Sequence, residues 1–152
     1  MSTLHFQYCQ KLVVYSKDEQ SILLCKRKGE ADYDGVFSFI WGKMETTDGT
    51  LVEGMQREKN EEVGENFKIR VFPSFTTNAF FLKKDGNAMV LPHIYAIHQG
   101  GEIVLNEEYS EYQRVPLAEI EHFEPKIGTI PEVLEKFKIL KETIHTTEGI
   151  II

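Results

Sequence analysis

Four charged residues near the middle of the chain have types and spacing that could hold a metal ion. They are Arg57, Glu58, Glu61 and Glu62, in the segment REKNEE. On a helix, offsets of three and four place side chains on one face, so Glu58 would lie beside both Glu61 and Glu62. Carboxylates packed in this way repel one another, but they are the hard oxygen ligands that Mg²⁺ and Mn²⁺ prefer. Arg57, four residues before Glu61, could pair with that carboxylate and fix its orientation.

The sequence around these residues predicts a strand, a loop and a helix in that order. A solvated acidic helix face would carry the same charges, so this context is needed to favour a site. Residues 36–40 form a short apolar run typical of a strand, and residues 42–50 contain the glycines and polar side chains typical of a loop. Apolar residues then recur at helical spacing, and Gly64 follows where a helix would end. We predict this helix over roughly residues 50–63.

The remaining elements favour an α+β fold. Predicted strands cover residues 9–16, 21–26, 67–72, 79–82, 88–91 with a continuation over 94–97, 102–105 and 112–115. The first two strands form a hairpin, and Asp85-Gly86 predicts a second hairpin between 79–82 and 88–91. A last helix is predicted over roughly 131–144, with an apolar stripe that packs in the core. Because strands and helices do not alternate strictly, we expect a mixed β-sheet with helices on its faces.

Length, charge and composition exclude several classes of protein. A chain of 152 residues is expected to form a single domain over 1–152. Its net charge of −7 disfavours binding to long nucleic acid, and no apolar run is long enough to cross a membrane. The first residues lack the pattern of a secretory signal, and Cys9 and Cys25 are expected to be buried free thiols. We therefore expect a cytoplasmic protein, as a monomer or homodimer, whose partner is a small molecule.

Around the acidic helix the sequence resembles the signature of the Nudix hydrolase (MutT-like) family. That signature is G-x5-E-x7-R-E-U-x-E-E-x-G-U, where U is an apolar residue. Its second half is matched in type and spacing by Arg57, Glu58, Glu61, Glu62 and Gly64. Gly42, followed by Lys43-Met44-Glu45, is similar to its opening glycine.

The chain departs from the signature mainly in the first half. The interval from Gly42 to Arg57 is one residue longer than in the family, which indicates an insertion in the loop. The glutamate of the first half falls on Gly49, and Asp48 is the nearest acid. Trp41 stands where a glycine often precedes the opening glycine, and Lys59 and Glu65 occupy the two late apolar positions.

The resemblance implies a Nudix fold, with a mixed β-sheet sandwiched between helices, and a Nudix-type pyrophosphohydrolase. Such an enzyme uses Mg²⁺ or Mn²⁺ and cleaves a diphosphate linkage in a nucleotide-like substrate, a nucleoside diphosphate linked to X, by water attack at phosphorus. The implied metal ligands are Glu58, Glu62, Glu61 and the Gly42 carbonyl. Glu61 is a further ligand or the base, and Arg57 orients it. The alternative is a non-catalytic Nudix-fold module that binds nucleotides or has a regulatory role, an interpretation supported by the unmatched acid of the first half.

Residues outside the signature are weaker candidates for the site. Trp41 adjoins the opening glycine and could stack on a base, and Arg27, with Lys26, could meet a phosphate. A further acid often comes from a distal loop in this family, and here the candidates are Glu107, Glu108 and Glu111, unless this segment is only a surface loop. The histidines His93 and His98 flank a predicted strand and are expected to be structural.

Overall fold

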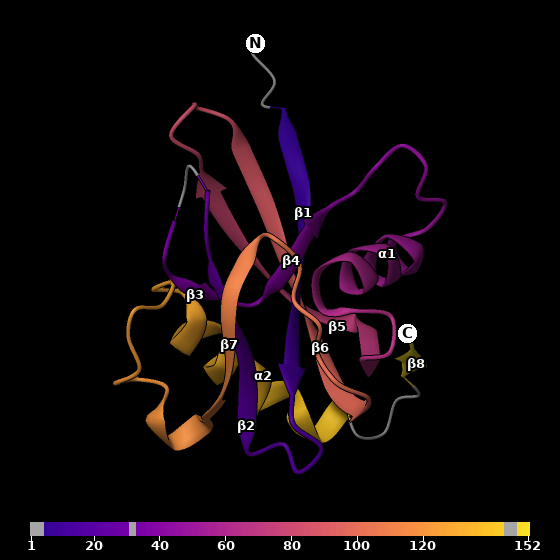
Figure 1. Ribbon diagram of the computed structural model, residues 1–152, viewed down its shortest axis with the longest axis vertical. Coiled ribbons are helices and arrows are strands. Elements are labelled where there is room, and N and C mark those ends of the chain that lie inside the picture. The colour runs from indigo at the N-terminus through magenta and orange to yellow at the C-terminus, as the bar shows by residue number, and fades with distance from the viewer. Residues whose placement is uncertain (1–4, 31–32, 145–148) are drawn as a thin grey trace.

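The structure is a computed structural model that describes residues 5–30, 33–144 and 149–152, and within them a mixed sheet carries two α-helices (Figure 1). In chain order the elements are β1 (Phe6–Tyr15), β2 (Ser21–Arg27), β3 (Phe37–Ser38), β4 (Ile40–Lys43), α1 (Leu51–Val63), β5 (Lys68–Leu82), β6 (Ala88–Gly100), β7 (Tyr109–Pro116), a short 3₁₀ helix (Leu117–Glu119), α2 (Ile130–Ile144) and β8 (Ile150–Ile151). No helix in these described ranges is long and apolar enough to cross a membrane.

The sheet is mixed, as predicted. Its main path runs β3-β2-β1-β6-β5-β8, with β4 paired to β1 and β7 paired to β2. The central strands β1 and β6 are parallel, and the other strand pairs are antiparallel. The hairpin predicted at Asp85-Gly86 joins β5 to β6. The two strands predicted over 67–72 and 79–82 are one strand, β5, whose register with β6 shifts between Val71 and Thr76.

The two helices cover opposite faces of the sheet (Figure 1). Successive side chains of a strand point to opposite faces, and β1 follows this rule. Val13 and Tyr15 pack in the cluster that contains the apolar stripe of α2, whereas Leu12 and Val14 pack in the cluster that contains Met55 of α1. The sandwich of helices around a mixed sheet, implied by the resemblance, is therefore confirmed. Cys9 and Cys25 are buried free thiols, also as predicted.

Local interactions determine where α1 begins and ends. The Thr50 hydroxyl caps the helix by accepting a hydrogen bond from the Glu53 backbone N–H at 3.1 Å, and the Glu53 carboxylate accepts one from the Gly49 N–H at 2.9 Å. Gly64, at a φ of 98°, ends the helix in a conformation that favours glycine. The predicted helix over 50–63 is thus confirmed.

Two predictions about neighbouring segments are wrong. The loop predicted over 42–50 begins later, because Gly42 and Lys43 belong to β4 and pair with β1. The strand predicted over 102–105 does not form, because this backbone pairs with the end of α1 instead of the sheet. Val104 N–H donates to the Val63 carbonyl at 2.9 Å, and Asn106 N–H donates to the Glu62 carbonyl at 3.1 Å. These bonds satisfy carbonyls that a helix C-terminus leaves without partners.

Lys59, in α1, occupies an apolar position of the signature, and its side chain is fully buried. Its ammonium donates to the carbonyls of Gly64 and Glu65, both at 3.3 Å. Burial, with a smaller contribution from the charge of Lys68, lowers the pKa of Lys59 from 10.5 to about 8. The folded chain therefore disfavours the charged form despite these two hydrogen bonds.

Replacing Lys59 by Met should raise the free energy of unfolding at pH 7 by about 1 kcal/mol, because an apolar side chain of similar length carries no charge to desolvate. The unfolded wild type binds more protons than the folded protein between about pH 8 and 10.5, so its stability rises with pH across that interval. The advantage of Lys59→Met should shrink over the same interval. Denaturant unfolding at several pH values checks this, with exposed Lys138→Met as the control; a variant less stable than wild type at every pH would contradict it.

Candidate active site

Glu62 of α1 is held in place by two hydrogen bonds. Its side chain is buried, one carboxylate oxygen accepts the Trp41 backbone N–H at 3.1 Å, and the other accepts the Tyr109 hydroxyl at 2.9 Å. Burial raises the pKa of Glu62 well above its ordinary value, and the nearby charges of Glu108 and Glu58 add to this effect. A buried carboxylate surrounded by other carboxylates is in a site that favours a bound cation.

Glu58 packs directly over Gly42 of β4. A Cβ atom added to Gly42 would lie 2.0 Å from both Cγ and Cδ of Glu58, so only glycine leaves room for this side chain. Burial raises the pKa of Glu58, and the charges of Glu61 and Glu108 raise this pKa further. The hydrogen bond and the charge of Arg57 partly offset the increase. The opening glycine and the first glutamate of the helix are thus fitted to each other.

Arg57 links the loop before α1 to the acidic residues of the helix. Its guanidinium donates two parallel hydrogen bonds of 2.9 Å to Asp48 and a third of 2.9 Å to the Lys43 carbonyl. It also donates to Glu58 at 2.7 Å and to Glu61 at 3.3 Å. The hydrogen bonds from Arg57 lower the pKa of Asp48 to about 2. Asp48 therefore pairs with Arg57 through both of its carboxylate oxygens. This contact explains how the chain tolerates Gly49 where the signature has a glutamate.

The acid on the distal loop that faces this cluster is Glu108. Its charge raises the pKa of both Glu58 and Glu62. Glu111 is instead half-exposed on β7, where its carboxylate lies 3.7 Å from the ammonium of Lys26. Tyr109, which holds Glu62, could not be identified from the sequence, because an aromatic residue after an acidic run carries no sign of a contact 47 positions away.

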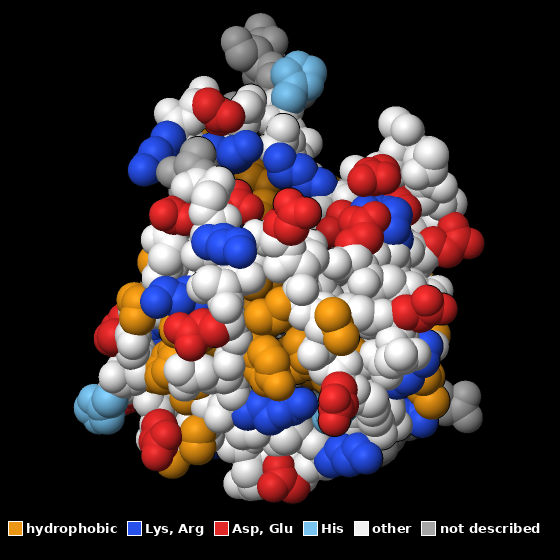
Figure 2. Space-filling view, in the orientation of Figure 1, with side chains coloured by type: hydrophobic (Ala, Val, Ile, Leu, Met, Phe, Trp, Pro, Cys, Tyr) orange, Lys and Arg blue, Asp and Glu red, His pale blue; other side chains and the backbone are white. Residues whose placement is uncertain are grey.

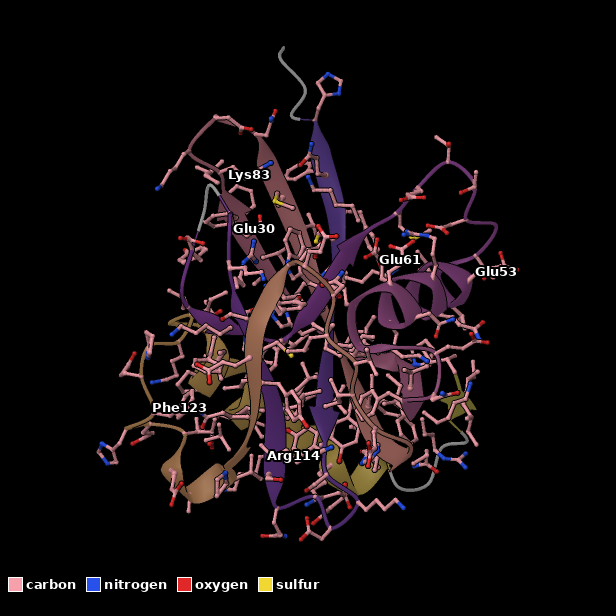
Figure 3. The ribbon with its side chains drawn as sticks, in the orientation of Figure 1. Glu30, Glu53, Glu61, Lys83, Arg114 and Phe123 are labelled. Atoms are coloured by element: carbon pink, nitrogen blue, oxygen red, sulfur yellow. The ribbon has the colours of Figure 1, made fainter. Side chains whose placement is uncertain are left out.

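A pocket of about 300 Å³ lies beside this cluster, between β1, β4 and the hairpin of β5 and β6. Its walls include Lys11, Arg27, Tyr33, Trp41, Phe81 and His93. Glu30 and Lys83, which are labelled in Figure 3, line the side of the pocket away from α1. Glu61 lies across from them on α1. Trp41 also lines the small cavity beside Glu58 and Glu62, so it connects the two regions.

The sequence-predicted residues Trp41 and Arg27 meet in this pocket. The Arg27 guanidinium carbon lies 4.5 Å from the centre of the Trp41 ring, an arrangement that favours a cation–π interaction. His93 is buried in the same pocket, and burial lowers its pKa to about 4, so it is neutral at ordinary pH. His98 stacks on Phe67 outside the pocket.

Residues 9–137 match the model of the NUDIX domain. The chain belongs to the Nudix family. The resemblance found in the sequence is confirmed, and with it the enzyme class, Nudix-type pyrophosphohydrolase, at the level of the family. No protein sequence with a curated description matches this chain.

Solved structures of low sequence identity share the Nudix fold. A MutT protein from Methanosarcina mazei is 18% identical with a TM-score of 0.74, and the match covers 93% of this chain and 99% of that chain. An Ap4A hydrolase from C. elegans, in a binary complex, is 15% identical with a TM-score of 0.71, covering 90% and 98%. The NUDIX domain of Shewanella oneidensis NrtR, in complex with ADP ribose, is 17% identical with a TM-score of 0.69, covering 90% and 88%.

The carboxylate oxygens of this Nudix site are the type of ligand that a divalent cation prefers, but they are not arranged as a complete set of ligands for one ion. No three Asp, Glu, His or Cys side chains converge for one ion in the part of the chain that the structure describes. Arg57 donates to both Glu58 and Glu61, and Glu62 faces Trp41 and Tyr109. Acidic side chains nevertheless gather over α1 (Figure 2). The charge of Glu108 disfavours the charged forms of Glu58 and Glu62, and the charge of Glu58 has the same effect on Glu62. A cation would relieve that repulsion.

Proposed function

We propose that this protein hydrolyses the diphosphate linkage of a nucleotide-like small molecule, a nucleoside diphosphate linked to a second group, with Mg²⁺ or Mn²⁺ as cofactor. The observation that carries the proposal is the fit of Glu58 over Gly42 beside the buried Glu62, at the edge of a pocket with an aromatic wall. Two of the similar structures support a nucleotide-like substrate: the NUDIX domain solved with ADP ribose and the structure of an Ap4A hydrolase.

Glu58 and Glu62 would hold the cation, with Glu108, Glu61 and the Gly42 carbonyl as further donors. A bound divalent cation would neutralise phosphate oxygens and lower the pKa of the attacking water. Glu61 is the candidate base, because its carboxylate is exposed and Arg57 orients it at 3.3 Å. Trp41 and Arg27 would position the substrate beside the carboxylates.

The test is a screen of nucleoside diphosphates linked to sugars, nucleosides or phosphate, with a phosphatase that releases inorganic phosphate from the monophosphate products. We expect phosphate release from at least one class of substrate with Mg²⁺ or Mn²⁺, and none with excess chelator. The Glu62→Gln protein serves as the control for contaminating hydrolases. If no substrate class releases phosphate in a metal-dependent way, the non-catalytic binding module becomes the better interpretation.

A further inference from the structure

Two buried cationic side chains, Lys11 and Arg27, face the pocket, and of these only Arg27 has so far been given a role, in positioning the substrate. Lys11 is 6% exposed and Arg27 is 5% exposed. The Lys11 ammonium lies 5.5 Å from the centre of the Trp41 ring, and the Arg27 guanidinium carbon lies 4.5 Å from the same ring. Lysine and arginine are rarely buried this deeply without a partner of opposite charge.

Their charges are only partly balanced. Arg27 lies 3.2 Å from Glu30, but its buried Nε has no hydrogen-bond partner among the described residues. Over residues 5–30, 33–144 and 149–152, no carboxylate lies within ion-pair distance of Lys11. Burial and the charge of Arg27 lower the pKa of Lys11 to about 8, so it is still charged at neutral pH. Among the described residues, these two cations therefore have one carboxylate in ion-pair contact, that of Glu30, and the charge of Glu62 acts on Lys11 only from beyond that distance.

Lys11 points away from the acidic cluster, to the other face of β1. In β1, Gln10 and Leu12 line the small cavity that contains Glu58 and Glu62, whereas Lys11 between them lines the large pocket. Side chains of adjacent strand residues point to opposite faces, so β1 separates Lys11 from the carboxylates. A substrate whose diphosphate lies beside Glu58 and Glu62 therefore reaches Lys11 with a different part of the molecule, and Arg27 lies over the same Trp41 ring as Lys11.

We propose that Lys11 and Arg27 form an anion-binding subsite that selects substrates carrying a second negatively charged group, a phosphate or a carboxylate, apart from the diphosphate that is cleaved. The inference rests on the proposed function, because it assigns the diphosphate to the acidic side of the pocket. The aromatic Trp41 between the two regions would hold a flat part of the same molecule.

The subsite can be tested without hydrolysis, using inorganic phosphate and metal-free protein. Trp41 is the sole tryptophan, so its fluorescence reports on the pocket, and calorimetry gives an independent measure of binding. We expect saturable binding that weakens about tenfold or more in Lys11→Met and in Arg27→Gln, because each loses a charge-assisted contact. Lys11→Arg should retain binding, and Lys17→Met, which removes the same charge from an exposed turn, should not change it.

Pairs of substrates that differ by one anionic group show whether the subsite prefers a carboxylate or a phosphate. UDP-glucuronate differs from UDP-glucose by a carboxylate, and NADP differs from NAD by a phosphate. In at least one pair, KM should be about tenfold lower for the charged member in the wild type, and this preference should disappear in Lys11→Met. Circular dichroism confirms that each variant is folded.

Equal binding of phosphate by wild type and both variants, or equal KM values within both pairs, would overturn the inference. These outcomes are separable from failure of the proposed function. Phosphate binding that depends on Lys11 without any hydrolysis rejects only the hydrolase. Metal-dependent hydrolysis without a preference for charged substrates rejects only the anion subsite.

Discussion

Replacing Glu62 or Glu58 by Gln should lower metal-dependent hydrolysis by more than about 100-fold, because even residues that only support metal ligands typically contribute 10- to 100-fold. Glutamine keeps the size of the side chain and can still accept the Trp41 N–H that Glu62 now accepts. What it removes is the negative charge that a divalent cation requires. Steady-state kinetics on the substrate found by the screen, at several Mg²⁺ concentrations, measure the loss.

The same variants should remain folded, which separates a lost site from a lost structure. Without metal, Glu62→Gln should be at least as stable as the wild type, because it removes a buried charge beside Glu58 and Glu108. Mg²⁺ should raise the thermal midpoint of the wild type and leave that of Glu62→Gln unchanged. Glu53→Gln, at the exposed start of α1, is the matched control. Full activity in both Glu58→Gln and Glu62→Gln would exclude the metal-site mechanism.

The elements that sequence analysis predicted well are those specified by local signals. The start of α1 is encoded by Thr50 and its end by Gly64, and both act within a few residues. The apolar stripe of α2 has helical spacing, and its residues Ile130, Val133, Leu134, Phe137 and Ile144 are buried. The mixed sheet follows from the order of these elements.

The errors arose where partners are distant along the chain. Residues 102–105 have the composition of a strand, but Val104 donates to Val63 at the end of α1 instead of to a strand. In the site, the spacing of Glu58, Glu61 and Glu62 follows from the helix alone. Their different environments do not, because Tyr109 reaches Glu62 from β7. Nor does composition show that Lys11 and Trp41 are paired across β1 and β4.

Gly42→Ala should abolish most of the hydrolytic activity with only a modest loss of stability. The added Cβ would lie 2.0 Å from two carbons of the Glu58 side chain, closer than packed atoms can approach, so Glu58 must move away from its position. We expect activity to fall by about 10- to 100-fold, since displacement of a group by about 1 Å typically has an effect of this order. The unfolding free energy should fall by about 1 to 3 kcal/mol, as in other overpacked sites.

The control is Gly128→Ala, whose Cβ would meet no atom within 4 Å. A second variant separates the steric clash with Glu58 from the loss of its carboxylate's position. In the Gly42→Ala protein, Glu58→Asp shortens the crowded side chain by one methylene. This change should recover stability, because the clash is relieved, but not activity, because the shorter carboxylate no longer reaches the same place. Recovery of both would show that the position of the Glu58 carboxylate is unimportant. Full activity in Gly42→Ala alone would show that the fit between β4 and α1 has no role in the reaction.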